Sequence, residues 1–423
     1  MTGNEHGIAA LWGPELARSL ADSFDAGRAR ALVAELAGER FFGRPTGSPG
    51  GAMAAAHLVT TFASLGLAVS TQRFDAVDVP SFTATPVLHV AWPGETKTFE
   101  HRIDFAEHPR SALAPQVLTG RAAASRDADA TGSWIILDAV PQHNGLARLA
   151  HDVAEHGAIG LLTPQIPDAD GFLAKRLLGG PIVELPIVAV RQDLLRSLDG
   201  AVVTANAPVA RTTVAGVNVL AEIPGSDPAL ADEPVLLTAH FDGVGADPGR
   251  HFPAAGDNAS GVAVLAEIAR VLSGSDWQCA RPIRFAVLDA EEVGAQGSRA
   301  HAKGLLAEGI RPLVLNVDMA GRHHGAVSAE LGAGSDALRE ALDHAGRLLG
   351  ITLIAATVAS DNRSYAAAGF PAVGLGLGAA HYHSPRDAAE HVEPEALGHA
   401  GQLLLVALTR LASSRVARPQ GGN

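Results

Sequence analysis

The chain contains a single cysteine, Cys279, and relatively few basic residues. One cysteine cannot form an intrachain disulfide, which fits a reducing compartment. Asp and Glu outnumber Lys and Arg by 45 to 32, and the resulting net charge of −13 at pH 7 repels a phosphate backbone. We therefore expect no nucleic acid partner, and we interpret the negative charge as an aid to solubility.

Long apolar runs are also missing. No stretch approaches the ~20 apolar residues that a membrane-spanning helix needs. The N-terminal segment MTGNEHGIAALWGPELARSL lacks the basic region and apolar core of a signal peptide. The sequence thus predicts no membrane partner and favours a cytoplasmic location, although a secreted mature form without its leader would look the same.

The 423 residues are 47% hydrophobic, which is enough for a large core in two or three domains. Helical periodicity in 28–36 and 52–65 is interrupted by the Gly- and Pro-rich segment FFGRPTGSPGG. We predict four parts, in chain order: N-terminal helices packing on the largest domain (1–75), an inserted smaller β-rich domain (76–210), the largest domain (211–415) and a flexible tail (416–423).

From Asn218 onward, apolar strands alternate with helices. Helices are expected at about 259–272, 335–349 and 394–413. The expected strands are VNVLAEI, PVLLTAHF, IRFAVLDA, PLVLNVDMA, ITLIAATVA and PAVGLGL. Near-continuous apolar strands with helical crossovers predict an α/β fold with a mixed, largely parallel sheet sandwiched by helices. Ligands bind at the carboxyl ends of the strands in such sheets.

Candidate metal ligands stand at those strand ends. The strand PVLLTAH ends in His240, and Asp242 follows on the same side of an extended backbone, where it can brace the imidazole. Asp257 lies between glycines in GDNASG, a segment that also reads simply as a helix cap. The flanking glycines favour a carboxylate that bridges two cations.

Three further strand ends add to this set. IRFAVLDA runs into Glu291 and Glu292, whose mutual repulsion a cation would offset, with one as a ligand and the other as a base. Asp318 follows the apolar run PLVLNV, and His383 lies in the loop after the last strand. Five nitrogen and oxygen ligands without cysteine are a mixture that suits zinc and differs from a thiol-rich structural site.

These segments resemble the co-catalytic di-zinc aminopeptidase family, whose relatives include glutamate carboxypeptidase and glutaminyl cyclase. The matching pieces occur in the family's order over 216–412: AHFD, GDNASGVAVLAEIAR, IRFAVLDAEEVGAQGSRAH, NVDMAGR, SDNRSYAAAGFPAVGL and YHSPRD. The resemblance implies the phosphorylase/hydrolase-like fold of zinc peptidases. It also implies that the segment 80–205, with GSWIILD and VAEHGAIGLLT, is similar to a protease-associated domain.

Carried over to this chain, the resemblance implies two zinc ions. His240 and Asp318 would hold one, and Glu292 and His383 the other. Asp257 would bridge the two ions. The remaining implied roles are those of a general base, an orienting carboxylate and a hydroxyl that steadies the oxyanion, and they fall on Glu291, Asp242 and Tyr382 in that order.

The expected activity is hydrolysis of peptide or amide bonds by zinc-activated water, most simply as an aminopeptidase acting on peptides. Hydrolysis of N-acyl amino acids or other small amides stays open, as does a glutaminyl cyclase-like acyl transfer with one zinc. A non-catalytic binding relative would lose ligands, whereas this chain retains the full set. Asn362 stands where the family often has His, which leaves the role of its loop open. Oligomeric state is not readable from the sequence.

Overall fold

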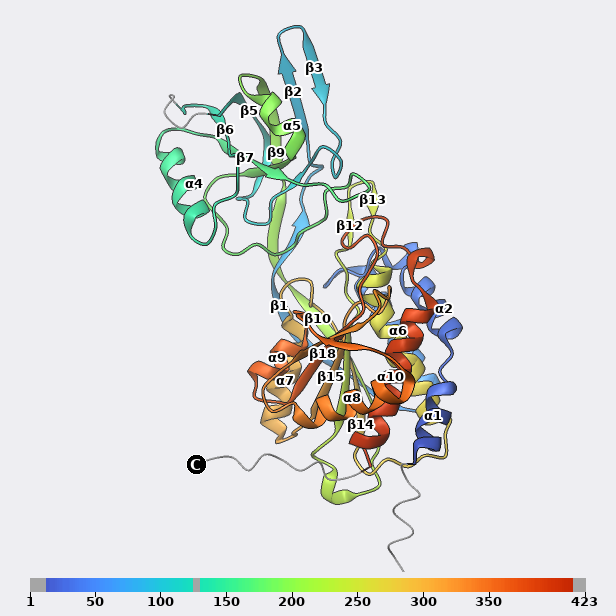
Figure 1. The fold of residues 1–423 in the computed structure, drawn as a ribbon. Coiled ribbons are helices and arrows are strands. Elements are labelled where there is room, and N and C mark those ends of the chain that lie inside the picture. The colour runs from blue at the N-terminus through green and yellow to red at the C-terminus, as the bar shows by residue number, and fades with distance from the viewer. Residues whose placement is uncertain (1–12, 125–129, 414–423) are drawn as a thin grey trace, which may run out of the picture. The chain divides into compact units, whose positions relative to one another are not determined.

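A computed structural model describes residues 13–124 and 130–413, so the predicted tail at 416–423 lies outside the described residues. The chain divides into two compact units (Figure 1). Unit 1 comprises residues 1–76, 214–246 and 251–423, and unit 2 comprises 77–213 and 247–250. Strands β1 (Ala68–Phe82) and β10 (Val209–Ile223) each contribute residues to both units.

Unit 1 is built on a sheet with eight strands in the described residues. Their order is β1, β10, β14 (Ile283–Leu288), β11 (Val235–His240), β15 (Leu313–Val317), β18 (Ala372–Gly376), β16 (Val327–Leu331) and β17 (Leu353–Ala355). The central strands β14, β11, β15 and β18 are mutually parallel, whereas β10 and β16 pair antiparallel with their neighbours β14 and β18. This is the mixed, largely parallel α/β fold that the sequence predicts.

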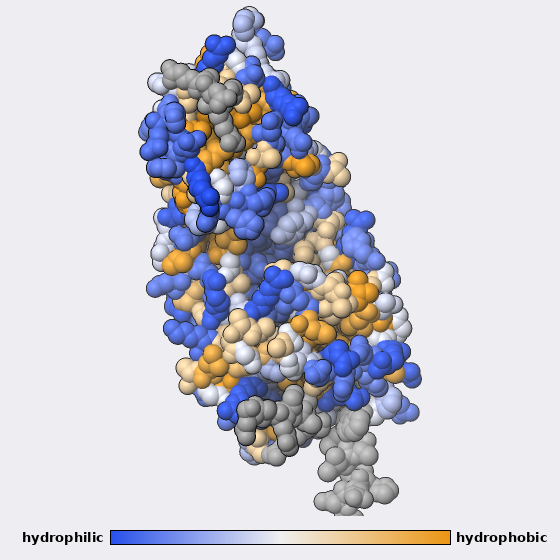
Figure 2. All heavy atoms as spheres, turned by 60° about the vertical axis from the view of Figure 1, so that its left-hand side comes forward, coloured by the Kyte–Doolittle hydropathy of each residue, from blue (hydrophilic) through white to orange (hydrophobic). Residues whose placement is uncertain are grey.

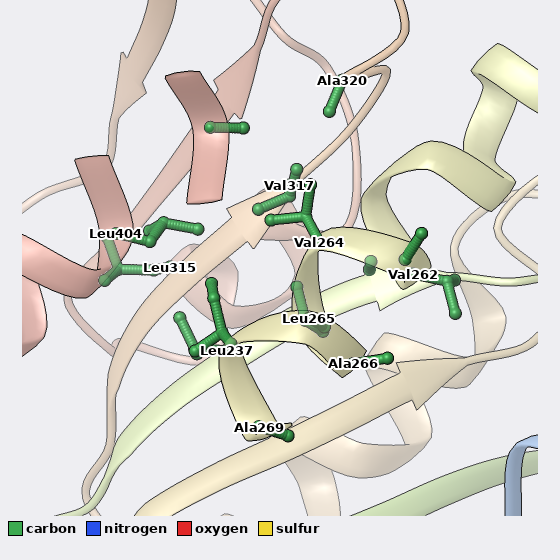
Figure 3. Packing of buried hydrophobic residues seen from close by; sticks show 14 of the residues in the cluster. Leu237, Val262, Val264, Leu265, Ala266, Ala269, Leu315, Val317, Ala320 and Leu404 are labelled. Carbon is green, nitrogen blue, oxygen red and sulfur yellow. The ribbon is translucent and has the colours of Figure 1, made fainter. Parts of the chain in front are cut away.

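Both faces of the central strands are buried, because neighbouring side chains of a strand point to opposite faces. Leu237 packs in the main core, while Leu236 packs in a second core on the other face with Leu305 and Tyr365. Figure 3 shows the main core, where helix α6 (Ser260–Ser273) directs Val264 and Leu265 onto the strands β11 and β15. The sheet is therefore a rigid platform whose carboxyl edge carries loops.

Helices cover the sheet. The helices of unit 1 other than α6 are α1 (Pro14–Asp22), α2 (Ala26–Leu36), α3 (Pro49–Ser64), α7 (Gln296–Glu308), α8 (Asp336–Leu349), α9 (Asn362–Ala367) and α10 (Pro394–Leu411). Leu20, Val33 and Phe62 bring the first three helices into the main core of unit 1. Their starts are set locally: Asp25 accepts the Gly27 and Arg28 N–H groups at α2, and Ser48 caps α3 just before Pro49.

Unit 2 has its own sheet and cores. The order of its strands is β3 (Glu95–Thr98), β2 (Leu88–Trp92), β9 (Val202–Ala207), β5 (Ala114–Ala123), β6 (Ser133–Ile136), β7 (Gly160–Gln165), β8 (Ile187–Arg191) and β4 (Phe105–Glu107), with α4 (Gly145–Glu155) and α5 (Gln192–Leu195) as its helices. Helix α4 buries Leu146 and Val153 against Ile135 and Leu161. The resemblance of this unit to a protease-associated domain stays a prediction.

A buried ion cluster in unit 2 holds residues that are distant in the sequence. Asp247 forms ion pairs with Arg102 and with Lys175, whose Nζ lies 2.8 Å from Asp247 Oδ1. Arg102 also pairs with Glu107. Arg102 is fully buried, so the surrounding carboxylates are needed to make its charge tolerable.

Some elements differ from the sequence-based expectation. The predicted strand at 351–359 is reduced to β17, since only Leu353–Ala355 find a partner, in β16. Strand β16 and helix α7 were not predicted. The polar, Ala-rich segment 204–215 is largely extended within β9 and β10, and the division between the two units falls inside it, between Thr213 and Val214.

Figure 2 shows hydrophilic side chains over much of the face in view, with separate apolar patches between them. Within residues 13–124 and 130–413, no helix is long and apolar enough to span a bilayer.

Candidate metal centre

The parallel strands of unit 1 end at the same edge of the sheet. In the parallel register His240, at the end of β11, lies opposite Leu288, at the end of β14. Glu291 and Glu292 follow β14, Asp318 follows β15, and the loop after β18 carries His383. The irregular turn Ala255–Ala259, which precedes α6, brings Asp257 to the same edge. The five side chains proposed as ligands from sequence are thereby brought together.

They form two groups that share Asp257. In the first group, His240 Nε2 lies 3.3 Å from Asp257 Oδ1 and 3.4 Å from Asp318 Oδ1. In the second, His383 Nε2 lies 3.2 Å from Asp257 Oδ2 and 3.0 Å from Glu292 Oε2. The two oxygens of Asp257 therefore face different histidines. Each group offers ligand atoms within 4.8 Å of one another, so each could hold a metal ion.

The ring of His240 is oriented by its own backbone. Its Nδ1 lies 3.1 Å from the carbonyl oxygen of Asp242, which can only accept a hydrogen bond, so Nδ1 carries the proton. Nε2 is then the nitrogen that faces Asp257 and Asp318, and it is the one that can bind a metal. The Asp242 carboxylate is 3.5 Å from Nδ1, a weaker contact than its main chain makes.

The Asp242 carboxylate instead holds the two glutamates. The N–H of Glu291 donates to Oδ1 and the N–H of Glu292 donates to Oδ2, both at 3.1 Å. Asp242 is fully buried and thus ties the end of β11 to the segment after β14. The carboxylate of Asp242 thus lies closer to the N–H groups of Glu291 and Glu292 than to His240 Nδ1, so the bracing of His240 that the sequence predicts stays a prediction.

The electrostatics of the group are those of crowded, buried charge. Burial alone would lower the pKa of His240, but the carboxylates of Asp242, Asp257 and Asp318 outweigh burial and raise it well above the ordinary value. Burial likewise opposes the shift at His383, whose pKa is raised by Glu292 and Asp257. Burial raises the pKa of Glu291, and the negative charges of Asp318 and Asp361 add to that rise although His240 opposes it.

Several polar atoms at this edge have no hydrogen-bond partner among the described residues. They include His240 Nε2, Asp318 Oδ1 and Glu292 Oε1, all of them shielded from solvent. Buried polar atoms without partners destabilise a fold unless a ligand satisfies them. The geometry and this shortage of partners both fit divalent cations.

Tyr382 lies on the open side of the group. Its ring stacks on that of His383, with centroids 3.8 Å apart and planes inclined by 15°, and 52% of the side chain is exposed. Partial burial raises its pKa, and the carboxylates of Asp257 and Glu292 raise it further. The hydroxyl is therefore protonated near neutrality and available as a donor.

Arg44 lies between the predicted helices of the N-terminal segment and was not predicted to be a functional residue. Its side chain is fully buried and donates to four main-chain carbonyls, those of Phe241 (2.6 Å), Leu36 (2.7 Å), Ala254 (2.7 Å) and Pro253 (2.9 Å). Burial lowers the pKa of Arg44 to about 10, while Asp387 and Asp242 counteract part of that effect. Arg44 thus fixes the backbone next to His240 and the loop that leads to Asp257.

Two further buried carboxylates support the same edge. Asp387 accepts the N–H groups of Gly256 (2.7 Å) and Asp257 (3.0 Å), which orients Asp257. Burial raises the pKa of Asp387 to about 7. Asp289 accepts from Thr46 Oγ1 at 2.9 Å and from the Val217 N–H at 3.0 Å, so it joins the N-terminal segment to β10. Only spatial neighbours reveal these roles.

Asn362, which stands where the resemblance leads one to expect histidine, is a packing residue. It is buried, its carboxamide presses against Gly374 of β18, and Oδ1 accepts the Ser360 N–H at 3.3 Å. The adjacent Asp361 is fully buried, and burial raises its pKa to about 7, partly opposed by His240. Cys279 is buried with Sγ 3.7 Å from the Pro224 carbonyl, before β14 begins, which fits the role of a small core residue.

Comparison with known proteins agrees with this geometry. Residues 218–408 match the sequence model of Peptidase family M28. The chain is similar to aminopeptidase YwaD of Bacillus subtilis (strain 168), with 30% identity over 189 residues that make up 41% of this chain and 40% of that protein. The match thus spans less than half of that relative's length.

Solved structures share the fold over most of the chain. BSAP, described as a zinc aminopeptidase from Bacillus subtilis, has a TM-score of 0.71 at 22% identity, with 91% of this chain and 94% of that chain covered. An aminopeptidase from Aneurinibacillus sp. strain AM-1 has a TM-score of 0.69 at 21% identity, covering 96% of this chain and 100% of that one. At these identities the structures establish the fold.

Proposed function

We propose, from the match of residues 218–408 to the model of Peptidase family M28, that this chain is a zinc-dependent exopeptidase that releases amino acids from the amino end of peptides. The observation that carries the proposal is the position of Asp257, whose two oxygens face His240 and His383 separately. A carboxylate shared in this way is suited to bridging two ions.

The ligand spacing supports zinc. Zinc binds nitrogen and oxygen ligands at about 2.0–2.2 Å, so two ligands of one tetrahedral ion lie about 3.4 Å apart. The separations between ligand atoms, 3.3 and 3.4 Å around His240 and 3.2 and 3.0 Å around His383, are close to that value. Imidazole and carboxylate ligands are also the set that zinc accepts in hydrolases.

In the proposed centre His240 and Asp318 would hold one zinc, Glu292 and His383 would hold the other, and Asp257 is the residue that would be shared by both. Zinc in such sites lowers the pKa of a bound water towards neutrality and polarises a carbonyl oxygen. Two ions per chain also offset the negative charge of Asp257, Glu292 and Asp318, which are otherwise crowded at one buried edge.

Glu291 acts as the general base. The N–H group of Glu291 is held by Asp242 at 3.1 Å, and burial, followed by the neighbouring carboxylates, raises the pKa of the Glu291 side chain. Glu291 accepts the proton from the attacking water and delivers it to the leaving amine. Asp242 is a positioning residue in this scheme, because it fixes the backbone of Glu291 and of Glu292 at once.

Tyr382 donates a hydrogen bond to the oxygen that becomes negative during the attack. Its raised pKa keeps the hydroxyl protonated, and its stacking on His383 places the ring beside the proposed second zinc. Donors placed at a developing oxyanion contribute more to the transition state than to the bound substrate.

Zinc counting together with a substrate panel tests the proposal. Elemental analysis of the dialysed protein should give two zinc ions per chain, against the one expected of a glutaminyl cyclase-like enzyme. Aminoacyl-anilides should be cleaved, chelator should abolish the cleavage, and added zinc should restore it. Preferential cleavage of N-acetyl or γ-glutamyl amides would replace the exopeptidase assignment by an amidohydrolase, and chelator-resistant cleavage would refute the metal mechanism.

A further inference from the structure

A second cluster of potential metal ligands lies outside the proposed zinc centre. It consists of His323, from the loop between β15 and β16, and of Glu395 and His399, from the first turns of α10. Each residue offers one ligand atom, and these atoms lie within 4.8 Å of one another. None of the three belongs to the five proposed zinc ligands.

Helix α10 sets the spacing between two of the three potential ligands. Glu395 and His399 are four residues apart, so they share one face of α10, and His399 Nε2 lies 3.9 Å from Glu395 Oε1. The ring of His323 meets that of His399 edge to face, with centroids 4.5 Å apart and planes inclined by 75°. The two imidazoles and the carboxylate thus converge from two segments of the chain.

Contact between two histidine rings could be packing alone, but their nitrogens argue otherwise. His323 Nε2 and His399 Nδ1 are both shielded from solvent without a hydrogen-bond partner among the described residues. Each such atom costs free energy of desolvation unless something binds it. The nitrogen of His399 that faces Glu395, at 3.9 Å, is Nε2, so binding of the shared ion through the unpartnered Nδ1 requires rotation of this ring.

The loop that carries His323 is already anchored to the helix. The Glu393 N–H donates to the Gly321 carbonyl at 2.8 Å, and the His323 N–H donates to Glu393 Oε2 at 3.0 Å. Arg322 adds an ion pair to Glu393 at 3.7 Å. Two hydrogen bonds and an ion pair therefore hold the backbone of His323 beside α10, and only side-chain rotations are needed to close the cluster.

We infer that His323, Glu395 and His399 form a third divalent-metal site, which takes Zn²⁺ with a water as the fourth ligand. Two imidazoles and one carboxylate are an established zinc-binding set. The ligand atoms lie within 4.8 Å of one another, whereas ligands of one tetrahedral zinc lie about 3.4 Å apart, so the cluster has to tighten to hold an ion. Glu395 can supply much of this movement, because 74% of its side chain is exposed.

Such a site would be structural. The ion would connect the segment after Asp318 to the start of α10. The negative charges of Glu393 and Glu395 would offset the repulsion between the ion and the positive N-terminal end of the helix. Binding to the folded state alone raises its stability by mass action. The inference does not depend on the proposed peptidase activity, since it uses other residues and predicts binding and stability.

The test is zinc binding by the intact protein after dialysis, with the tightly held metal in place. In equilibrium dialysis against micromolar free Zn²⁺, the wild-type protein should take up one equivalent per chain more than His399→Gln and Glu395→Gln. His324→Gln is the matched control, because His324 is exposed, adjacent to His323 and outside the cluster. Added Zn²⁺ should raise the Tm of the wild type and of the control by a few degrees, and should leave the Tm of the two cluster variants unchanged.

Equal zinc uptake by the wild type and both cluster variants would overturn the site, as would loss of the extra equivalent in the His324 variant. Glu395→Gln keeps the test decisive even if His399→Gln disturbs folding, because the exposed Glu395 has no packing role. Far-ultraviolet circular dichroism identifies variants that retain the fold.

Discussion

Replacement of Arg44 by Met tests whether a buried guanidinium outside the matched family segment supports the metal centre. Arg44 donates four hydrogen bonds to main-chain carbonyls at 2.6–2.9 Å. Methionine fills a similar volume without donors, so all four carbonyls lose this partner inside the protein. Two of them flank proposed ligands, since Phe241 follows His240 and Ala254 precedes Asp257 by three residues.

The size of the effect follows from these bonds. A hydrogen bond to a charged group contributes about 1.5–3 kcal/mol, so four contribute at least about 6 kcal/mol. Burial that lowers the Arg44 pKa from 12.5 to about 10 represents a cost of about 3 kcal/mol, which the substitution relieves. We expect a net destabilisation of about 3 kcal/mol, which also matches the usual cost of removing one partner from a buried charged network.

Urea unfolding and competitive zinc titration measure the two consequences separately. The transition of the variant should shift down by about 1 M urea, and its zinc affinity should fall about 10–100-fold because the ligand-bearing backbone is no longer held. Arg281→Met is the matched control: Arg281 is equally buried in unit 1 but binds Glu233, near the start of β14. An Arg44→Met protein with wild-type stability and zinc affinity would refute the reasoning, and so would an equal loss of zinc affinity in Arg281→Met.

Three further predictions concern other parts of the chain. Glu291→Gln should retain its zinc by elemental analysis while kcat on an aminoacyl-anilide falls about 10²–10⁴-fold; full activity would exclude Glu291 as the base. Gly401→Ala would place a methyl group 2.0 Å from the Phe24 ring and should cost about 1–3 kcal/mol in urea unfolding, whereas Gly398→Ala, with open space around it on the same helix, should not destabilise. Burial raises the pKa of Glu107, but Arg102 outweighs it and lowers the pKa from 4.5 to about 2. The ionised carboxylate therefore stabilises unit 2 by about 3 kcal/mol above pH 4.5, and this contribution is lost as the pH falls towards 2. The stability difference between wild type and Glu107→Gln, followed by near-ultraviolet circular dichroism, should shrink over that range; a difference independent of pH would contradict it.

The sequence predicted the position of a residue correctly where that position depends on a single strand or helix. Apolar runs such as VLLTAH and IRFAVL predict buried strands, and chemistry-bearing residues directly after them must lie at one edge if the strands are parallel. The fold class was predictable for this reason, and so was the proximity of His240 to Glu292. Once the strands are parallel, their pairing by itself places the residues that follow them at the same edge of the sheet.

Residues that act through distant partners were not predictable in this way. Arg44 lies in a Gly- and Pro-rich segment whose pattern indicates only a break between helices. Its hydrogen-bond acceptors are main-chain carbonyls, which every residue has and which a sequence therefore cannot identify. The contact of Asp242 with the Glu291 and Glu292 N–H groups depends on the exact end of two strands. Strand β16 was missed because VSAEL is short and owes its strand conformation to pairing with β18 and β17.

The burial of Arg44 among carbonyls of the ligand-bearing segments has a consequence for how this protein can be dissected. A fragment that begins at Val214 would keep all five proposed ligands, yet it would lack the guanidinium and the three N-terminal helices that complete the core. We therefore expect that the proposed metal centre does not form in such a fragment alone. Exchange of the first sixty-odd residues between relatives would alter metal affinity without touching a single ligand.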